Sequence, residues 1–130
     1  MTQNLGISKV VKLDFDNAVV RVKEVFKANG FGAVTEIDVK KILKEKIDAN
    51  FKQYTILGMC NPKIAMEALN TSDDIGLLIP CNVCVYENKN KEIVVSAIDP
   101  EVLLGLVNIP EMAEKASMVK GLIKKSVDEI

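Results

Sequence analysis

The stretch CNVCVYENKNKEIVVSAI, residues 81–98, predicts the fold class of this chain. Residues 81–87 and 92–98 are rich in valine and isoleucine, which favour strands. The four residues between them, Asn88, Lys89, Asn90 and Lys91, have the composition of a hairpin turn. Because strands joined by a hairpin pair antiparallel, we expect a mainly antiparallel sheet.

Before this hairpin, strand patterns alternate with helix patterns. Strands are predicted at residues 7–13, 31–37 and 53–59. Each is followed by a helix whose N-cap side chain accepts hydrogen bonds: Asp14, Asp38 and Asn61. Gly30 is the expected end of the first helix, since glycine adopts the left-handed cap conformation at little cost. Gly58 indicates a bulge or a close backbone approach in the third strand.

The segments that flank the hairpin complete the pattern. A polar loop is predicted at residues 71–74, followed by extended chain at residues 77–79. After the hairpin, a helical pattern begins at Asp99 and reaches Val107, and a last helix follows at residues 112–127. No linker or repeat interrupts the chain, so the sequence predicts a single α+β domain.

Composition narrows the class of protein. The chain has 130 residues, 48% hydrophobic and 27% charged, which suits one ordinary domain over residues 1–130. Its formal net charge is -1, and aromatic residues make up 5% with no tryptophan. This balance disfavours a nucleic-acid partner, which calls for a basic surface and stacking aromatic side chains. No apolar stretch approaches the roughly 18 residues that a membrane span needs, so no membrane association is expected.

The three cysteines are the best candidates for a site, because the chain has no histidine. An odd cysteine count without a visible signal peptide predicts free thiols and a cytoplasmic location. Cys60 directly precedes a helix start at Asn61 and Pro62, where the helix dipole favours a thiolate. The competing interpretation is that Cys60 packs as a small apolar side chain.

Cys81 and Cys84 form a C-x-x-C pattern, but strand geometry separates them. Residues three apart on a strand point to opposite faces, whereas a redox C-x-x-C opens a helix. Tetrahedral zinc takes four ligands, and this chain offers three cysteines and no histidine. We therefore expect Cys84 to be a core residue.

Cys60 and Cys81 are the more informative pair, because each adjoins a boundary marked by proline. If both boundaries lie at one end of the sheet, the two thiols could form a reversible disulfide, hold a soft metal or line a small-molecule cleft. Hydrogen bonds to a ligand would come from four polar residues: Asn61, Asn82, Tyr54 and Tyr86. The asparagines are equally well explained as cap and turn residues.

Several motifs together resemble the prokaryotic family known as domain of unknown function 302. They are YTILGMCNP at residues 54–62 and GLLIPCNV at residues 76–83, supported by residues 29–31, 35–39 and 99–100. The resemblance implies a curved antiparallel sheet with helices on one side, in an arrangement like that of the TATA-binding protein, and a homodimer. It marks Cys60 and Cys81, whereas Cys84 stands where the family usually has an aliphatic residue. It implies no activity, and the fold similarity does not imply DNA binding.

Three hypotheses for function follow. The preferred one is a cytoplasmic homodimeric binding or sensing module, with a thiol-lined cleft for a small ligand, a soft metal or a redox change. Its site residues are Cys60, Asn61, Cys81 and Asn82, and Cys60 and Cys81 would be the ligands of any metal. The alternative is a structural or interaction module whose cysteines are packed and unreactive. A thiol-dependent enzyme is disfavoured, because the commonest general base is missing and no cofactor motif is present.

Overall fold

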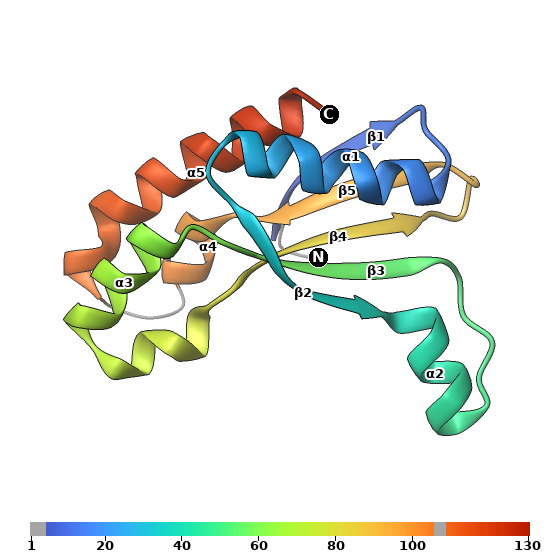
Figure 1. The fold of residues 1–130 in the computed structure, drawn as a ribbon, viewed down its shortest axis with the longest axis horizontal. Coiled ribbons are helices and arrows are strands. Elements are labelled where there is room, and N and C mark those ends of the chain that lie inside the picture. The colour runs from blue at the N-terminus through green and yellow to red at the C-terminus, as the bar shows by residue number, and fades with distance from the viewer. Residues whose placement is uncertain (1–4, 106–108) are drawn as a thin grey trace.

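A five-stranded sheet forms the centre of the computed structural model, which describes residues 5–105 and 109–130 (Figure 1). Its strand order is β1-β5-β4-β3-β2, and all four neighbouring pairs are antiparallel. The strands are β1 (Gly6–Val11), β2 (Gly32–Asp38), β3 (Tyr54–Cys60), β4 (Cys81–Glu87) and β5 (Ile93–Ile98). The predicted α+β class and antiparallel sheet are confirmed.

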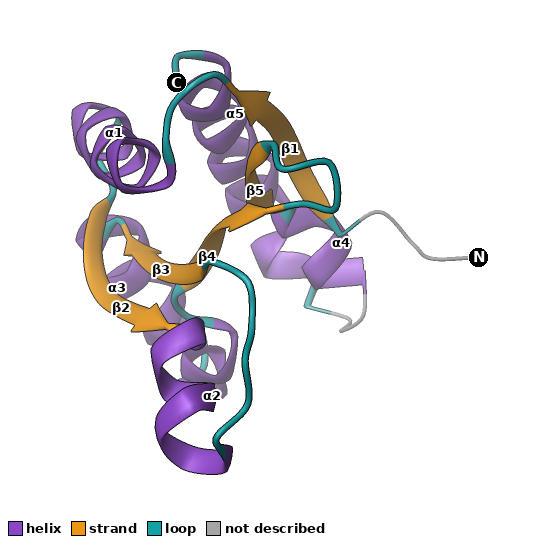
Figure 2. Cartoon of the chain, turned by 90° about the vertical axis from the view of Figure 1, so that its right-hand side faces the viewer, coloured by secondary structure: helices purple, strands orange, loops and turns teal. Residues whose placement is uncertain are grey.

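The helices cover one face of the sheet and both of its ends. They are α1 (Phe15–Ala28), α2 (Val39–Ile47), α3 (Pro62–Thr71), α4 (Pro100–Gly105) and α5 (Ala113–Asp128), with 3-10 turns η1 (Asp73–Leu78) and η2 (Pro110–Met112). Helices α1 and α5 lie side by side on the same face (Figure 2). Helices α3 and α4 gather at one end of the sheet, and α2 lies at the other (Figure 1).

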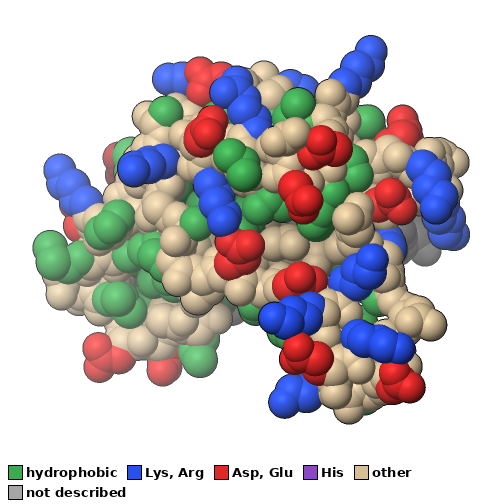
Figure 3. All heavy atoms as spheres, turned by 45° about the vertical axis from the view of Figure 1, so that its right-hand side comes forward, with side chains coloured by type: hydrophobic (Ala, Val, Ile, Leu, Met, Phe, Trp, Pro, Cys, Tyr) green, Lys and Arg blue, Asp and Glu red, His purple; other side chains and the backbone are tan. Residues whose placement is uncertain are grey.

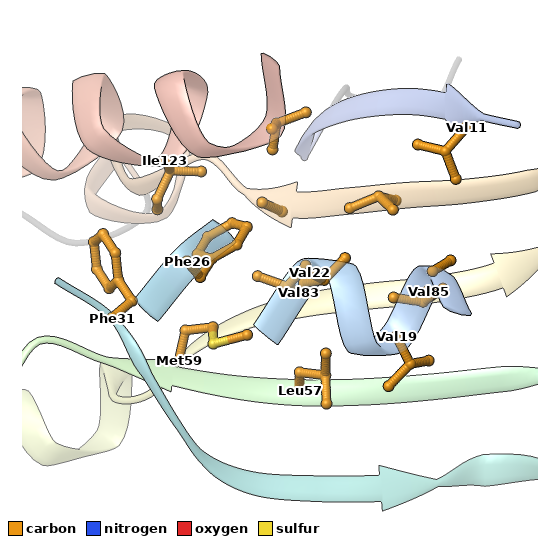
Figure 4. Packing of buried hydrophobic residues seen from close by; sticks show 14 of the residues in the cluster. Val11, Val19, Val22, Phe26, Phe31, Leu57, Met59, Val83, Val85 and Ile123 are labelled. Carbon is orange, nitrogen blue, oxygen red and sulfur yellow. The ribbon is translucent and has the colours of Figure 1, made fainter. Parts of the chain in front are cut away.

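The core fills the space between α1, α5 and the sheet (Figure 4). Val83 and Val85 on β4 are fully buried there, against Val22 and Phe26 of α1. Cys84 lies between the two valines in sequence, so the alternation of a strand turns it to the opposite face. The expectation that Cys84 is a core residue is therefore wrong. We call the sheet face turned away from α1 and α5 the outer face.

The predicted helix starts are confirmed by their hydrogen bonds. The side chains of Asp14, Asp38 and Asn61 accept from the backbone N–H three residues ahead, at 2.8, 3.0 and 3.2 Å. Gly30, just beyond the end of α1, has a φ of 92°, in the left-handed region that favours glycine. Local capping chemistry thus positions the helices as the sequence indicates.

The segment between α3 and β4 differs from the prediction. It forms η1 instead of a loop and extended chain, and the Ser72 hydroxyl accepts from the Asp74 N–H at 3.3 Å. The turn buries Ile75, which is 3% exposed. Burial of this side chain favours the compact turn over an extended run. The predicted helical residues 106–107 lie outside the described residues.

Thr35 and Pro80 approach the backbone of β3 closely at Gly58, so this position requires glycine, as predicted. The β2–β3 register shifts between Ala33 and Thr35, opposite this glycine. A Cβ atom at Gly58 would meet Thr35 Oγ1 and would lie 2.6 Å from Cγ of Pro80. The missing side chain therefore lets Pro80 pack on β3 immediately before Cys81.

Charged side chains of both signs are mixed over the face seen in Figure 3, without a single basic stripe. Apolar side chains gather at the end where α3 and η1 lie (Figure 3). They include Met66, Leu69 and Leu77, which are 63%, 40% and 84% exposed. None of the helices in the described part of the chain is long and apolar enough to span a bilayer.

Candidate functional site

A cavity with a free volume of about 100 Å³ lies at the end of the sheet where β3 leaves and β4 enters. Its walls come from the residue that precedes β2, the end of β3, the start of β4, and α3, η1, α4, η2 and α5. Most of the lining is aliphatic or aromatic, including Phe31, Ile64, Ile79, Leu103 and Val119. An apolar hollow with few polar groups is the usual form of a small-molecule site.

The cavity lies where two hydrophobic clusters meet. Phe31 and Met59 belong to the main core, whereas Ile75 and Met112 belong to a smaller cluster with Ala68. Small side chains at the wall, among them Ala65, Ala68 and Ala116, leave the space open. The cavity therefore results from the small side chains that lie where the two clusters meet.

Cys81 lines this cavity as the first residue of β4. Its Cα pairs with that of Met59 on β3, so both side chains lie on the helix-covered face of the sheet. Burial raises the pKa of the Cys81 thiol, and the nearby Cys60 raises it further. Cys81 is consequently a neutral thiol at neutral pH.

Cys60 lines the same cavity from the last position of β3. It directly precedes Asn61, the N-cap of α3, which also lines the cavity. The Oδ1 atom of Asn61 accepts a hydrogen bond from the Ile64 N–H. Both cysteines are half-buried, and all three cysteines of the chain are free thiols. The fold thus brings Cys60, Asn61 and Cys81 to one cavity from positions about twenty residues apart in sequence.

Asn82 and the two tyrosines lie elsewhere. Asn82 alternates with Cys81 on β4, is exposed, and borders a separate depression with Leu77 and Ile98. Tyr54 and Tyr86 stack on the outer face, with ring centroids 5.3 Å apart. Burial raises the pKa of Tyr54, and a hydrogen bond with Cys84 raises it further. The four hydrogen-bonding residues considered from sequence are therefore divided, and only Asn61 is at the cavity.

Three other residues that bring polar or soft atoms to the cavity wall were not predicted. Met59 and Met112 contribute thioethers, and Lys115 contributes an ammonium group. The Lys115 Nζ lies 2.9 Å from Glu67 Oε2, which joins α5 to α3. Met112 and Lys115 come from the last third of the chain, and no local motif links them to Cys60. Their helical spacing to Ala116 and Val119 was the one available signal.

Comparison with known proteins identifies the family. The family model described as domain of unknown function DUF302 matches residues 7–130. The chain belongs to the DUF302 family. A similar crystal structure is that of an uncharacterized conserved protein DUF302 from Bacillus stearothermophilus, with a TM-score of 0.89 and 27% sequence identity. The match covers 97% of this chain and 98% of the other. No curated protein matches the chain.

Proposed function

We propose that this DUF302 domain is a binding module whose ligand occupies the cavity at Cys60 and Cys81. The observation that carries the proposal is an apolar cavity with two free thiols in its wall. A buried water needs only about 10–15 Å³ of such volume. A cavity of about 100 Å³ therefore has room for a compact ligand much larger than one water.

The wall chemistry favours a ligand with an apolar or soft surface. Neutral Cys81 and the methionine side chains are polarizable and weakly hydrated, so they contact such a ligand without a large desolvation cost. Asn61 and Lys115 are polar groups at the same wall that could orient the ligand. We expect the module to work in the cytoplasm, where free thiols persist.

Selective alkylation of the cysteines tests this proposal. An apolar cavity should favour neutral N-ethylmaleimide over anionic iodoacetate, because the anion loses its hydration on entry. For each cysteine, the ratio of the two rate constants is measured by peptide mass spectrometry in the native protein and in urea. We expect folding to raise this ratio about tenfold at Cys60 and Cys81, equivalent to ~1.4 kcal/mol, and less at Cys84.

A variant with a filled cavity is the matched control for that experiment. Ala68→Leu adds bulk at a wall position that is 4% exposed and should abolish the maleimide preference. Equal ratios at all three cysteines, or cavity thiols that react only in urea, would contradict the proposal. The second result would favour the alternative of packed, structural cysteines.

The proposal includes a homodimer, which the family resemblance supports. A second copy would cover the exposed apolar side chains of Met66, Leu69 and Leu77, because isolated domains rarely leave such a group in water. Sedimentation equilibrium should give twice the mass of one chain. Leu77→Lys should shift the equilibrium toward monomer, while the similarly exposed substitution Ile47→Lys on α2 should not. A monomeric parent chain would refute the dimer.

A further inference from the structure

Sulfur atoms are concentrated around the cavity. The chain contains three cysteines and five methionines, and four of these residues line this one hollow: Met59, Cys60, Cys81 and Met112. Among the others, Cys84 lies on the outer face, and Met66 and Met118 are 63% and 49% exposed. The concentration combines two thiols with two thioethers in a wall that is mostly apolar and also contains Asn61 and Lys115.

We propose that the cavity binds one monovalent copper ion, Cu(I), through the thiolates of Cys60 and Cys81, with the thioethers of Met59 and Met112 as neutral ligands. This inference rests on the proposed function, because it names the ligand of the same cavity. Thiolate and thioether sulfurs are soft ligands that select Cu(I). The mostly apolar wall of the cavity would also help to shield such an ion from oxidants.

The positions of the four residues allow ligands to approach from more than one side. Met59 and Cys81 are cross-strand partners on β3 and β4, and Cys60 follows Met59 directly. Met112 enters from η2, which leads into α5 on another wall of the cavity. A metal in the hollow would therefore be held between the sheet and the helical layer, which come from distant parts of the sequence.

The donor set distinguishes Cu(I) from the divalent metals. Within residues 5–105 and 109–130, no three His, Cys, Asp or Glu side chains gather where they could hold a metal ion. Structural zinc usually takes four such ligands. Cu(I) needs fewer charged ligands, and the two thiolates with added thioethers provide a suitable set.

Binding of the ion changes the charge in the cavity. Cu(I) replaces the protons of two thiols, so two protons are released and the resulting bis-thiolate complex carries one negative charge. Cys60 lies at the N-terminal end of α3, where the helix dipole favours that charge. The ammonium group of Lys115 lines the same cavity and adds to the effect, although Glu67 offsets part of it.

Competition with a chromophoric chelator tests the inference on the full chain. The reduced protein is titrated without oxygen against the Cu(I) complex of bicinchoninate. We expect one ion per chain, and a loss of affinity of at least about 100-fold in Cys60→Ser and in Cys81→Ser. Met59→Leu and Met112→Leu should each lose about tenfold, because leucine keeps the volume and removes the sulfur.

Matched controls separate the site from ordinary thiol binding. Cys84→Ser and Met118→Leu alter the same residue types outside the cavity and should keep the parent affinity. Thermal unfolding of every metal-free variant identifies any that fail to fold. If a serine variant fails to fold, the leucine variants still test the site.

Equal affinity in the parent and in Cys60→Ser/Cys81→Ser would overturn the inference, as would an equal loss in Cys84→Ser. The alkylation experiment makes the two proposals distinguishable. If the double variant binds Cu(I) as tightly as the parent while the native thiols prefer N-ethylmaleimide, the copper assignment is wrong and the cavity remains a site for another ligand. If the preference is also absent, both proposals fail.

Discussion

Cys81 and Cys84 are three residues apart on β4, yet they lie in two different regions of the molecule. Cys81 is on the helix-covered face and borders the cavity, whereas Cys84 is on the outer face beside Tyr54. On the outer face, side chains of neighbouring strands contact each other at the surface. Examples are the Tyr54–Tyr86 stack and the 2.7 Å hydrogen bond between Ser8 and Ser96. For these two thiols of β4, the side of the strand decides which one lines the cavity.

The largest expected difference between the two faces is in stability. Leu57 is fully buried on the helix-covered face, and its β3 neighbour Ile56 is only half-buried on the outer face. Leu57→Ala should lower the free energy of unfolding by ~2–5 kcal/mol, because it removes core contacts and leaves a cavity. Ile56→Ala should cost clearly less, because that side chain already contacts water. Urea unfolding of both variants measures the contrast, and equal losses would show that the faces are not energetically distinct.

A smaller loss of stability is expected from a substitution at Gly58, where Pro80 packs on β3 immediately before Cys81. Gly58→Ala should destabilise the protein by ~1–3 kcal/mol, because the new methyl group collides with Thr35 and Pro80. Displacing Pro80 should also make Cys81 more accessible, which alkylation can measure. Gly32→Ala is the control within the same sheet, because a Cβ atom there meets nothing within 4 Å. If both variants unfold at the same urea concentration, the close approach of Pro80 has no energetic role.

The comparison also explains which features could be predicted from the sequence. The hairpin turn and the helix starts depend on neighbouring residues: the Asn88 side chain, for example, accepts from the N–H groups of Asn90 and Glu92, both at 2.9 Å. Such contacts are present in the sequence as local patterns. Strand alternation likewise predicted that Cys81 and Cys84 point apart, although it does not say which face is covered by helices. The position of Cys84 was therefore misjudged.

The cavity could be predicted only in part, because its wall is assembled from distant segments. The sequence marked Cys60 and Cys81 by their prolines, but nothing near them indicates Met112 or Lys115. The segment that became η1 was also ambiguous, since a short apolar run suits a strand or a buried turn equally well. Burial of Ile75 against the smaller cluster decides its conformation, and that contact exists only in the folded chain.

The smallest expected effect sharpens the contrast between the two thiols of β4 and concerns the metal-free protein. Burial is the larger cause of the raised pKa of Cys81, and Cys60 is the smaller one. A raised pKa means less thiolate at a given pH, so the alkylation of Cys81 should rise at higher pH than that of a free cysteine. Cys60→Ser should lower the pKa of Cys81 but leave it above its ordinary value, because burial remains.

Cys84→Ser is the control for this measurement. It should leave the pH profile of Cys81 unchanged, because the two side chains lie on opposite faces of the sheet. The profiles are obtained from iodoacetamide rate constants at each cysteine, resolved by peptide mass spectrometry. A shift in Cys84→Ser as large as that in Cys60→Ser would mean that the thiols communicate through the sheet. Cys60 and Cys81 could then no longer be treated as a pair defined by one cavity.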